Sequence, residues 1–317
     1  EIRPMVTENY DGGDLVLGTS GLVLSPKEFP HLTGLKGRTL LTSDGTTILG
    51  ADDKAGIAEI LTMIERIQTE NRPHGTICVA FTPDEEIGMG AEHFNLDQFG
   101  AEYAYTLDGD SEGEIQYENF NACKAEFEIR GFNVHPGEGK DTMINASLVA
   151  IEINNCLPSM ETPRGTEDYE GFYHLISMQG EVGEAKLNYI VRDHDKNGFE
   201  ERKKTLRLIE KNLNAKWGEG TVTLKITDQY LNMKEIVEEH MHLIDHAKKA
   251  CEAAGVAPLI LPIRGGTDGC QLSFKGLPCP NLGTGGHAFH GPYEHISVEG
   301  MEKSVELLLA LIQEYTK

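Results

Sequence analysis

The order of strand-like and helix-like segments is the feature that most constrains how this chain folds. In the first third, apolar strand-like runs at residues 39–42, 75–82 and 103–107 surround one helix-like run at residues 54–70. The helix-like run is amphipathic, because its apolar residues recur at spacings of three and four: Ile57, Ile60, Leu61, Ile64 and Ile67. This alternation predicts an α/β domain, in which helices flank a mixed or largely parallel sheet.

The middle of the chain follows a different order. Strand patterns at 125–130, 174–178, 187–191 and 221–226 are interleaved with helix patterns at 146–156 and 199–217. The resulting β-α-β-β-α-β order is typical of a ferredoxin-like α+β domain.

The α/β pattern then returns, with a helix predicted at 235–254, a strand at 258–262 and a closing helix at 298–315. We therefore expect a catalytic domain in two parts, residues 1–120 and 231–317, with a smaller domain, residues 121–230, inserted between them.

Charge and composition narrow the classes of partner. The net charge of −23 over 317 residues disfavours nucleic acid and anionic membranes as partners. We find no apolar stretch near the ~18 residues needed to span a bilayer. The six cysteines form no CxxC pair, which favours reduced thiols and a cytoplasmic location.

Acidic residues follow three predicted strands or precede a helix in the α/β part. They are Asp52 and Asp53, then Asp84, Glu85 and Glu86, then Asp108 and Asp110. Strand ends in an open α/β sheet share one crevice, and carboxylates gathered there repel one another unless a cation neutralises them. The pattern therefore predicts a divalent metal site; the alternative for any single residue is a helix N-cap.

In the adjacent pair Glu85–Glu86, one carboxylate can bind metal while the other acts as a base towards substrate. A histidine ligand has to come from elsewhere in the chain. The glycine-rich segment 285–292 before the last helix offers His290, with His287 and His295 as rivals.

Five motifs together resemble the tripeptide aminopeptidases of the M20 metallopeptidase family. They are LGADDKAG at 49–56, FTPDEE at 81–86, FNVHPG at 132–137, PIRGGTDG at 262–269 and FHG at 289–291. The likeness extends over essentially the whole chain. It implies a zinc-dependent enzyme that removes the N-terminal residue from short peptides.

The resemblance also implies roles for individual residues. Asp52 would bridge two Zn²⁺ ions, Glu86, Asp108 and His290 would complete the ligand set, and Glu85 would be the general base. The Asp52–Asp53 peptide bond would be cis. The inserted domain would serve as a lid and as the interface of a homodimer.

Further residues of the inserted domain and its neighbouring loop would contact substrate. By the same resemblance, His135 would reach into the active site of the partner subunit and stabilise the developing oxyanion. We expect an arginine to hold the terminal carboxylate of the peptide, with Arg192 favoured over Arg264, and we place Asn145 beside them as a substrate-binding residue.

One departure from the family concerns the first metal-binding motif. The family carries an earlier His-x-Asp motif, and this sequence contains none. The family's first strands and helix are missing too, so we expect the sequence to be part of a longer polypeptide. The alternatives are an M20 deacylase or dipeptidase that uses the same metals, and a non-catalytic remnant that binds peptide or metal.

Overall fold

The computed structural model describes residues 1–316, which form two compact units. Unit 1 contains Glu1–Tyr117, Met233–Leu261 and the chain from Thr267 onward, and unit 2 contains Glu118–Asn232 and Pro262–Gly266. The boundaries after residues 117 and 232 lie close to the expected seams. The assignment of 262–266 to unit 2 differs from the sequence expectation, because Ile263 and Gly265 exchange backbone hydrogen bonds with Glu118 and Phe120.

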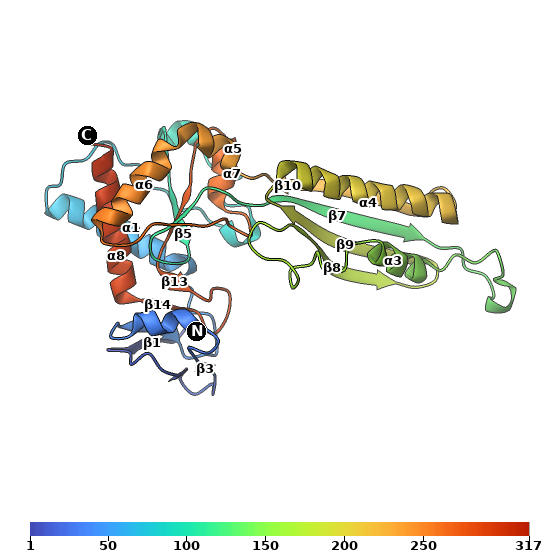
Figure 1. The fold of residues 1–317 in the computed structure, drawn as a ribbon, viewed down its shortest axis with the longest axis horizontal. Coiled ribbons are helices and arrows are strands. Elements are labelled where there is room, and N and C mark those ends of the chain that lie inside the picture. The colour runs from blue at the N-terminus through green and yellow to red at the C-terminus, as the bar shows by residue number, and fades with distance from the viewer. Residues whose placement is uncertain (317) are drawn as a thin grey trace. The chain divides into compact units, whose positions relative to one another are not determined.

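Unit 1 contains two four-stranded sheets and a two-stranded ribbon (Figure 1). The first sheet is antiparallel, with the order β1 (Pro4–Thr7), β4 (Leu40–Ser43), β14 (His295–Ser297) and β13 (Gly286–His287). The second is mixed, with the order β11 (Leu259–Ile260), β6 (Glu114–Gln116), β12 (Asn281–Gly283) and β5 (Thr106–Gly109). The ribbon pairs β2 (Leu15–Val16) with β3 (Val23–Leu24).

The helices of unit 1 are α1 (Ala51–Thr69), α2 (Leu96–Phe99), α5 (Lys234–Val237), α6 (His242–Ala253), α7 (Asp268–Phe274) and α8 (Val298–Glu314). The helix expected at 235–254 is divided, because a short 3₁₀ turn, Glu238–His240, separates α5 from α6. Helix α8 packs against both α1 and α6 and buries an apolar face that includes Val305, Leu308 and Leu311. These contacts make α8 the central helix of the unit.

The strand predicted at 75–82 is absent, which corrects the sequence analysis. No backbone hydrogen bond joins this segment to any other within the described chain, so it has no strand partner. Val79 and Phe81 are 38% and 49% exposed, and on α1 Ile57 and Leu61 are 38% and 52% exposed. A strand forms only against a neighbouring strand, and alternating hydrophobicity does not supply one.

Unit 2 follows the expected order of elements. It runs β7 (Asn121–Arg130), α3 (Ala146–Asn155), β8 (Phe172–Gly180), β9 (Glu184–Asp193), α4 (Lys196–Trp217) and β10 (Val222–Tyr230), and its antiparallel sheet has the order β10-β7-β9-β8. One continuous core joins the sheet to both helices through residues such as Phe127, Ile153, Leu187 and Leu206. This is a ferredoxin-like arrangement.

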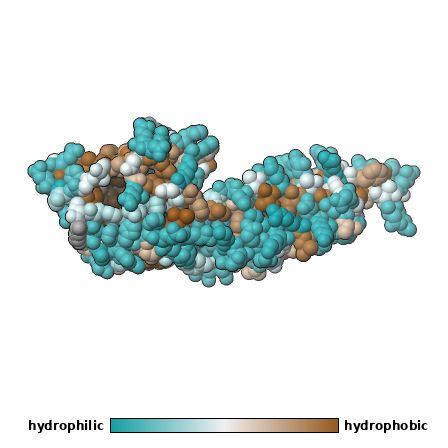
Figure 2. All heavy atoms as spheres, turned by 90° about the horizontal axis from the view of Figure 1, so that it is seen from above, coloured by the Kyte–Doolittle hydropathy of each residue, from teal (hydrophilic) through white to brown (hydrophobic). Residues whose placement is uncertain are grey.

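No helix among residues 1–316 has the length and hydropathy required to cross a bilayer. On the face visible in Figure 2, hydrophilic residues predominate and apolar residues are interspersed among them.

Candidate metal centre

Asp52 lies at the start of α1, where the backbone departs from helical geometry. Asp52 and Asp53 have ψ angles of 106° and 41°, and the peptide bond between them is cis, as the resemblance implied. Gly50, before them, has φ = 74° and carries no side chain that could cap the helix. The Asp52 carboxylate is therefore presented by an irregular first turn.

Three side chains from distant segments converge in unit 1. Nε2 of His290 lies 2.9 Å from Oδ2 of Asp52 and 3.1 Å from Oε2 of Glu86. One ligand atom from each residue lies within 4.8 Å of the other two, and no other group of three such residues meets this criterion in the described chain. Glu86 comes from the 3₁₀ turn Glu85–Ile87 and His290 from the loop between β13 and β14.

Asp108 on β5 belongs to the same acidic cluster. Its pKa is raised to about 9, chiefly by burial and then by the charges of Asp53, Glu85 and Asp52. Burial likewise raises the pKa of Asp53 to about 8. Clustered carboxylates of this kind either bind protons or bind a cation.

Glu85 stands beside Glu86 at the edge of this cluster. Burial raises the pKa of Glu85 to about 7, and the charges of Asp268, Glu86 and Asp52 add to the effect while His290 opposes it. Asp268, at the start of α7, is 3% exposed, and neither of its carboxylate oxygens has a hydrogen-bond partner among residues 1–316. The site thus extends from α1 to α7.

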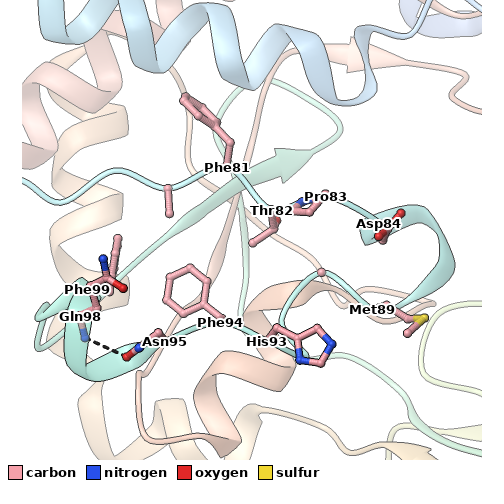
Figure 3. A pocket seen from close by; sticks show the side chains of 12 residues that line it. Phe81, Thr82, Pro83, Asp84, Met89, His93, Phe94, Asn95, Gln98 and Phe99 are labelled. Carbon is pink, nitrogen blue, oxygen red and sulfur yellow. Dashed lines mark hydrogen bonds between the residues drawn. The ribbon is translucent and has the colours of Figure 1, made fainter.

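A wide cavity of about 520 Å³ lies against residues 80–84, directly before Glu85 in the sequence. Figure 3 shows Phe81, Thr82 and Pro83 along one wall leading to Asp84, and Met89, His93 and Phe94 along the other. The end of the unpaired segment, residues 80–82, therefore borders this cavity.

The sequence analysis missed Glu59, which lies on α1. Its side chain is 1% exposed, and neither of its oxygens has a partner among residues 1–316. Burial, followed by the charge of Asp53, raises its pKa to about 10. Its position on the buried face of an amphipathic helix was the only available signal.

The rival histidines lie outside the convergent group. His287 and His295 belong to β13 and β14 and contact His31 instead, with ring centroids 4.0 and 5.1 Å from that of His31. His290 alone, in the loop between the two strands, is in contact with Asp52 and Glu86.

His135 and Asn145 lie in unit 2. The exposed His135 precedes a 3₁₀ turn and accepts a hydrogen bond from the Gly137 N–H at Nδ1. Asn145 is the N-cap of α3, where its side-chain oxygen accepts from the Leu148 N–H. Asn145 therefore has a structural role, whatever its part in binding.

Both candidate arginines also lie in unit 2, and both make internal contacts. Arg192 is 8% exposed, donates to the carbonyls of Cys123 and Val191 and lies over the ring of Tyr230. Arg264 donates to the carbonyls of Asp168 and Glu170 and to Oγ1 of Thr166. It also stacks on Phe120, 5.1 Å from the ring centroid. Substrate binding by either residue stays a prediction.

The convergent group, Asp52, Glu86 and His290, offers donor atoms that suit a divalent metal ion. Two carboxylates and one imidazole are the ligands that Zn²⁺ and related ions take in proteins. The close approach of Asp52 and Glu86 to the same imidazole nitrogen places three donors around one point. Asp108, whose pKa is raised in part by the charge of Asp52, offers a further carboxylate on the side of β5.

Comparison with known proteins identifies the family of the chain. The profile of Peptidase family M20/M25/M40 matches residues 45–314. Peptidase T of Halothermothrix orenii is 54% identical over 316 residues, which cover 99% of this chain and 78% of that protein.

Solved structures show the same fold. Aminopeptidase PepT from Bacillus cereus superposes with a TM-score of 0.77 at 28% identity, over 88% of this chain and 74% of that one. The YXEP protein of Bacillus subtilis, described as a dinuclear metal-binding peptidase from the M20 family, gives a TM-score of 0.65 at 16% identity, over 99% of this chain and 87% of that one. The predicted family is thereby confirmed: the chain belongs to peptidase family M20/M25/M40.

Proposed function

We propose that the chain is a two-zinc aminopeptidase that removes the first residue from tripeptides. The observation that carries the proposal is the convergence of Asp52, Glu86 and His290 within 4.8 Å. The names of the relatives, peptidase T and aminopeptidase PepT, support this choice of substrate and reaction.

In this proposal Asp52 would be shared by the two ions, Glu86 and His290 would help to hold one of them, and Asp108 would help to hold the other. When bound, divalent ions supply Lewis-acid polarisation and make water more acidic. Asp108 and Asp53 have pKa values raised to about 9 and 8 without any cation, so we expect a bound cation to favour their ionised forms.

Glu85 is the proposed general base. Its carboxylate would accept a proton from water as the water oxygen attacks the first peptide carbonyl, and would then give that proton to the leaving amine. Its place next to Glu86, which is in contact with His290, supports this role.

The residues of unit 2 complete the proposal. His135 would donate a hydrogen bond to the oxyanion that develops in the active site of the partner subunit, while Arg192, or else Arg264, would hold the peptide carboxylate with help from Asn145. A tripeptide with an amidated C-terminus tests the arginine clamp, because unchanged KM for the amide excludes it. The zinc identity, a cytoplasmic location and dimerisation through unit 2 belong to the same proposal.

The open edge of β8 supports the dimer. This strand pairs only with β9 in the described chain, and Ile176 and Met178 on it are 55% and 41% exposed. The unpaired backbone N–H and C=O groups of such an edge strand can pair with a strand of a second copy. Ile176→Lys should shift the protein towards monomers in sedimentation, and a wild-type monomer would contradict the proposal.

Asp52→Asn provides the direct test of the metal centre, with the exposed Asp97→Asn as the control carboxylate. Asp52→Asn should reduce bound metal and abolish tripeptide hydrolysis, whereas Asp97→Asn should leave both as in the wild type. The rates at which di- and tripeptides are hydrolysed, compared with those for acyl-amino acids, define the substrate class. Wild-type metal content in folded Asp52→Asn would refute the proposed centre.

A further inference from the structure

Glu294 ties together two segments that carry proposed metal ligands. Its side chain is 1% exposed. Oε2 accepts a hydrogen bond from the Gly50 N–H at 2.7 Å, and Oε1 accepts one from the Asp52 N–H at 3.0 Å. A single buried carboxylate thus holds the backbone on both sides of Ala51.

The other end of this connection is the loop that presents His290. Glu294 follows His290 by four residues, and its own N–H donates to the Gly291 carbonyl at 3.2 Å, which closes the intervening turn. Directly after Glu294, β14 pairs with β4. The position of Glu294 is therefore fixed by the sheet on one side and by the turn next to His290 on the other.

The first turn of α1 needs such a partner. Asp52 and Asp53 depart from helical geometry, and Gly50 has no side chain that could accept from the backbone N–H groups of this irregular turn. A carboxylate is well suited to this place because its charge strengthens both hydrogen bonds.

The His290 loop also needs support. Ala288 and His290 have φ angles of 55° and 60°, a region that residues other than glycine seldom occupy. Such conformations persist where surrounding contacts hold them. Contacts that anchor Glu294 restrict this loop directly.

We infer that Glu294 is a positioning residue of the metal centre: it sets the spacing between the Asp52 carboxylate and the His290 imidazole. The inference rests on the proposed metal-binding function. Both Glu294 oxygens are occupied by backbone N–H groups, so its action on the metal passes through Asp52 and His290.

Glu294→Gln is the test, because the amide keeps the size of the side chain but replaces one acceptor by a donor that faces an N–H group. We expect Co²⁺ affinity, measured by calorimetry, to fall about 10- to 100-fold, as is typical when residues that orient metal ligands are changed. The visible absorption of bound Co²⁺ should change in shape, and hydrogen exchange at the Gly50 and Asp52 amides should accelerate.

Glu299→Gln is the matched control. Glu299 also accepts hydrogen bonds from a backbone N–H, that of Thr39 at 3.0 and 2.9 Å, but Thr39 adjoins no proposed ligand. This variant should keep wild-type Co²⁺ affinity and absorption. If Glu294→Gln does not fold, Glu294→Asp takes its place, because it retains the charge and shortens the reach.

The variant Asp52→Asn distinguishes failure of the proposed metal centre from failure of the proposed role of Glu294. If Asp52→Asn binds Co²⁺ as the wild type does, the proposed metal centre is wrong. If Asp52→Asn loses Co²⁺ while the folded Glu294 variant keeps wild-type affinity and spectrum, the centre stands and the role of Glu294 is refuted. Weaker binding and an altered spectrum in the Glu294 variant alone, with Glu299→Gln unchanged, support the inference.

Discussion

His31 and His295 are joined by a hydrogen bond between their Nε2 atoms, which lie 2.8 Å apart. Nδ1 of His295 lies 2.7 Å from the Tyr293 carbonyl, which can only accept, so Nδ1 carries the proton. Nε2 of His295 is then the acceptor and His31 the donor. With His287 stacked on His31, three neutral imidazoles join the 3₁₀ turn Pro30–Leu35 to β13 and β14.

This histidine cluster should make unit 1 sensitive to acid. Burial, together with the nearby His31, His295 and Arg38, lowers the pKa of His287 to about 3, and burial lowers that of His295 to about 4. Because the unfolded chain takes up these protons near pH 6.5, stability is complete above that pH. It falls as the pH drops towards 3–4, by about 2 kcal/mol for each such histidine at pH 5.

His287→Phe tests this prediction, since the ring can still stack but cannot titrate. The loss of unfolding free energy between pH 7 and pH 5 should shrink by about 2 kcal/mol in urea titrations. The exposed His74→Phe is the control and should keep the wild-type loss. An unchanged loss in His287→Phe would show that the cluster does not govern acid stability.

Replacement of Glu85 by glutamine should separate chemistry from metal binding. We expect kcat for a tripeptide to fall about 10²- to 10⁴-fold, because proton transfer is lost, while the metal content per chain stays at the wild-type value. Glu86→Gln is the comparison, since Glu86 contacts His290 and its loss should reduce metal content as well. Full turnover by Glu85→Gln with metal bound would exclude Glu85 as the base.

Much of this architecture follows from local sequence pattern. The order of elements in unit 2 and the acidic residues at the start of α1, after segment 75–82 and on β5 were predictable, because periodicity and strand ends are local properties. The absence of a strand at 75–82 was not predictable in this way, because a strand forms only where a neighbouring strand pairs with it. Glu294 was not either: Pro292-Tyr293-Glu294 reads as a surface loop, and its partners at Gly50 and Asp52 lie more than 240 residues away.

Arg264 offers a choice between a structural and a substrate-binding role. Its hydrogen bonds to Thr166, Asp168 and Glu170 hold a loop that has no helix or strand of its own. Arg264→Ala should therefore destabilise unit 2 by about 2–3 kcal/mol and accelerate hydrogen exchange at 166–170.

Arg264→Lys should give little rescue, because lysine lacks the planar fork that reaches several acceptors. Arg164→Ala, at an exposed arginine just before the loop 166–170, is the control. A raised KM for tripeptides with unchanged exchange at 166–170 would instead favour the carboxylate clamp.

Glu59 should destabilise unit 1 at neutral pH, because folding forces its carboxyl to take up a proton. Its pKa rises from an ordinary 4.5 to about 10 on burial. Its stabilising contribution is thus fully present below pH 4.5 and is lost as the pH rises towards 10, with a cost at pH 7 of about 3 kcal/mol.

Glu59→Gln removes this cost, so it should stabilise the protein at pH 7 by up to that amount and have little effect at pH 4. Urea titrations at both pH values measure the difference, with the exposed Glu65→Gln as the control on the same helix. Equal effects of Glu59→Gln at the two pH values would mean that Glu59 is ionised in the folded protein, and that a cation or donor outside residues 1–316 meets it there.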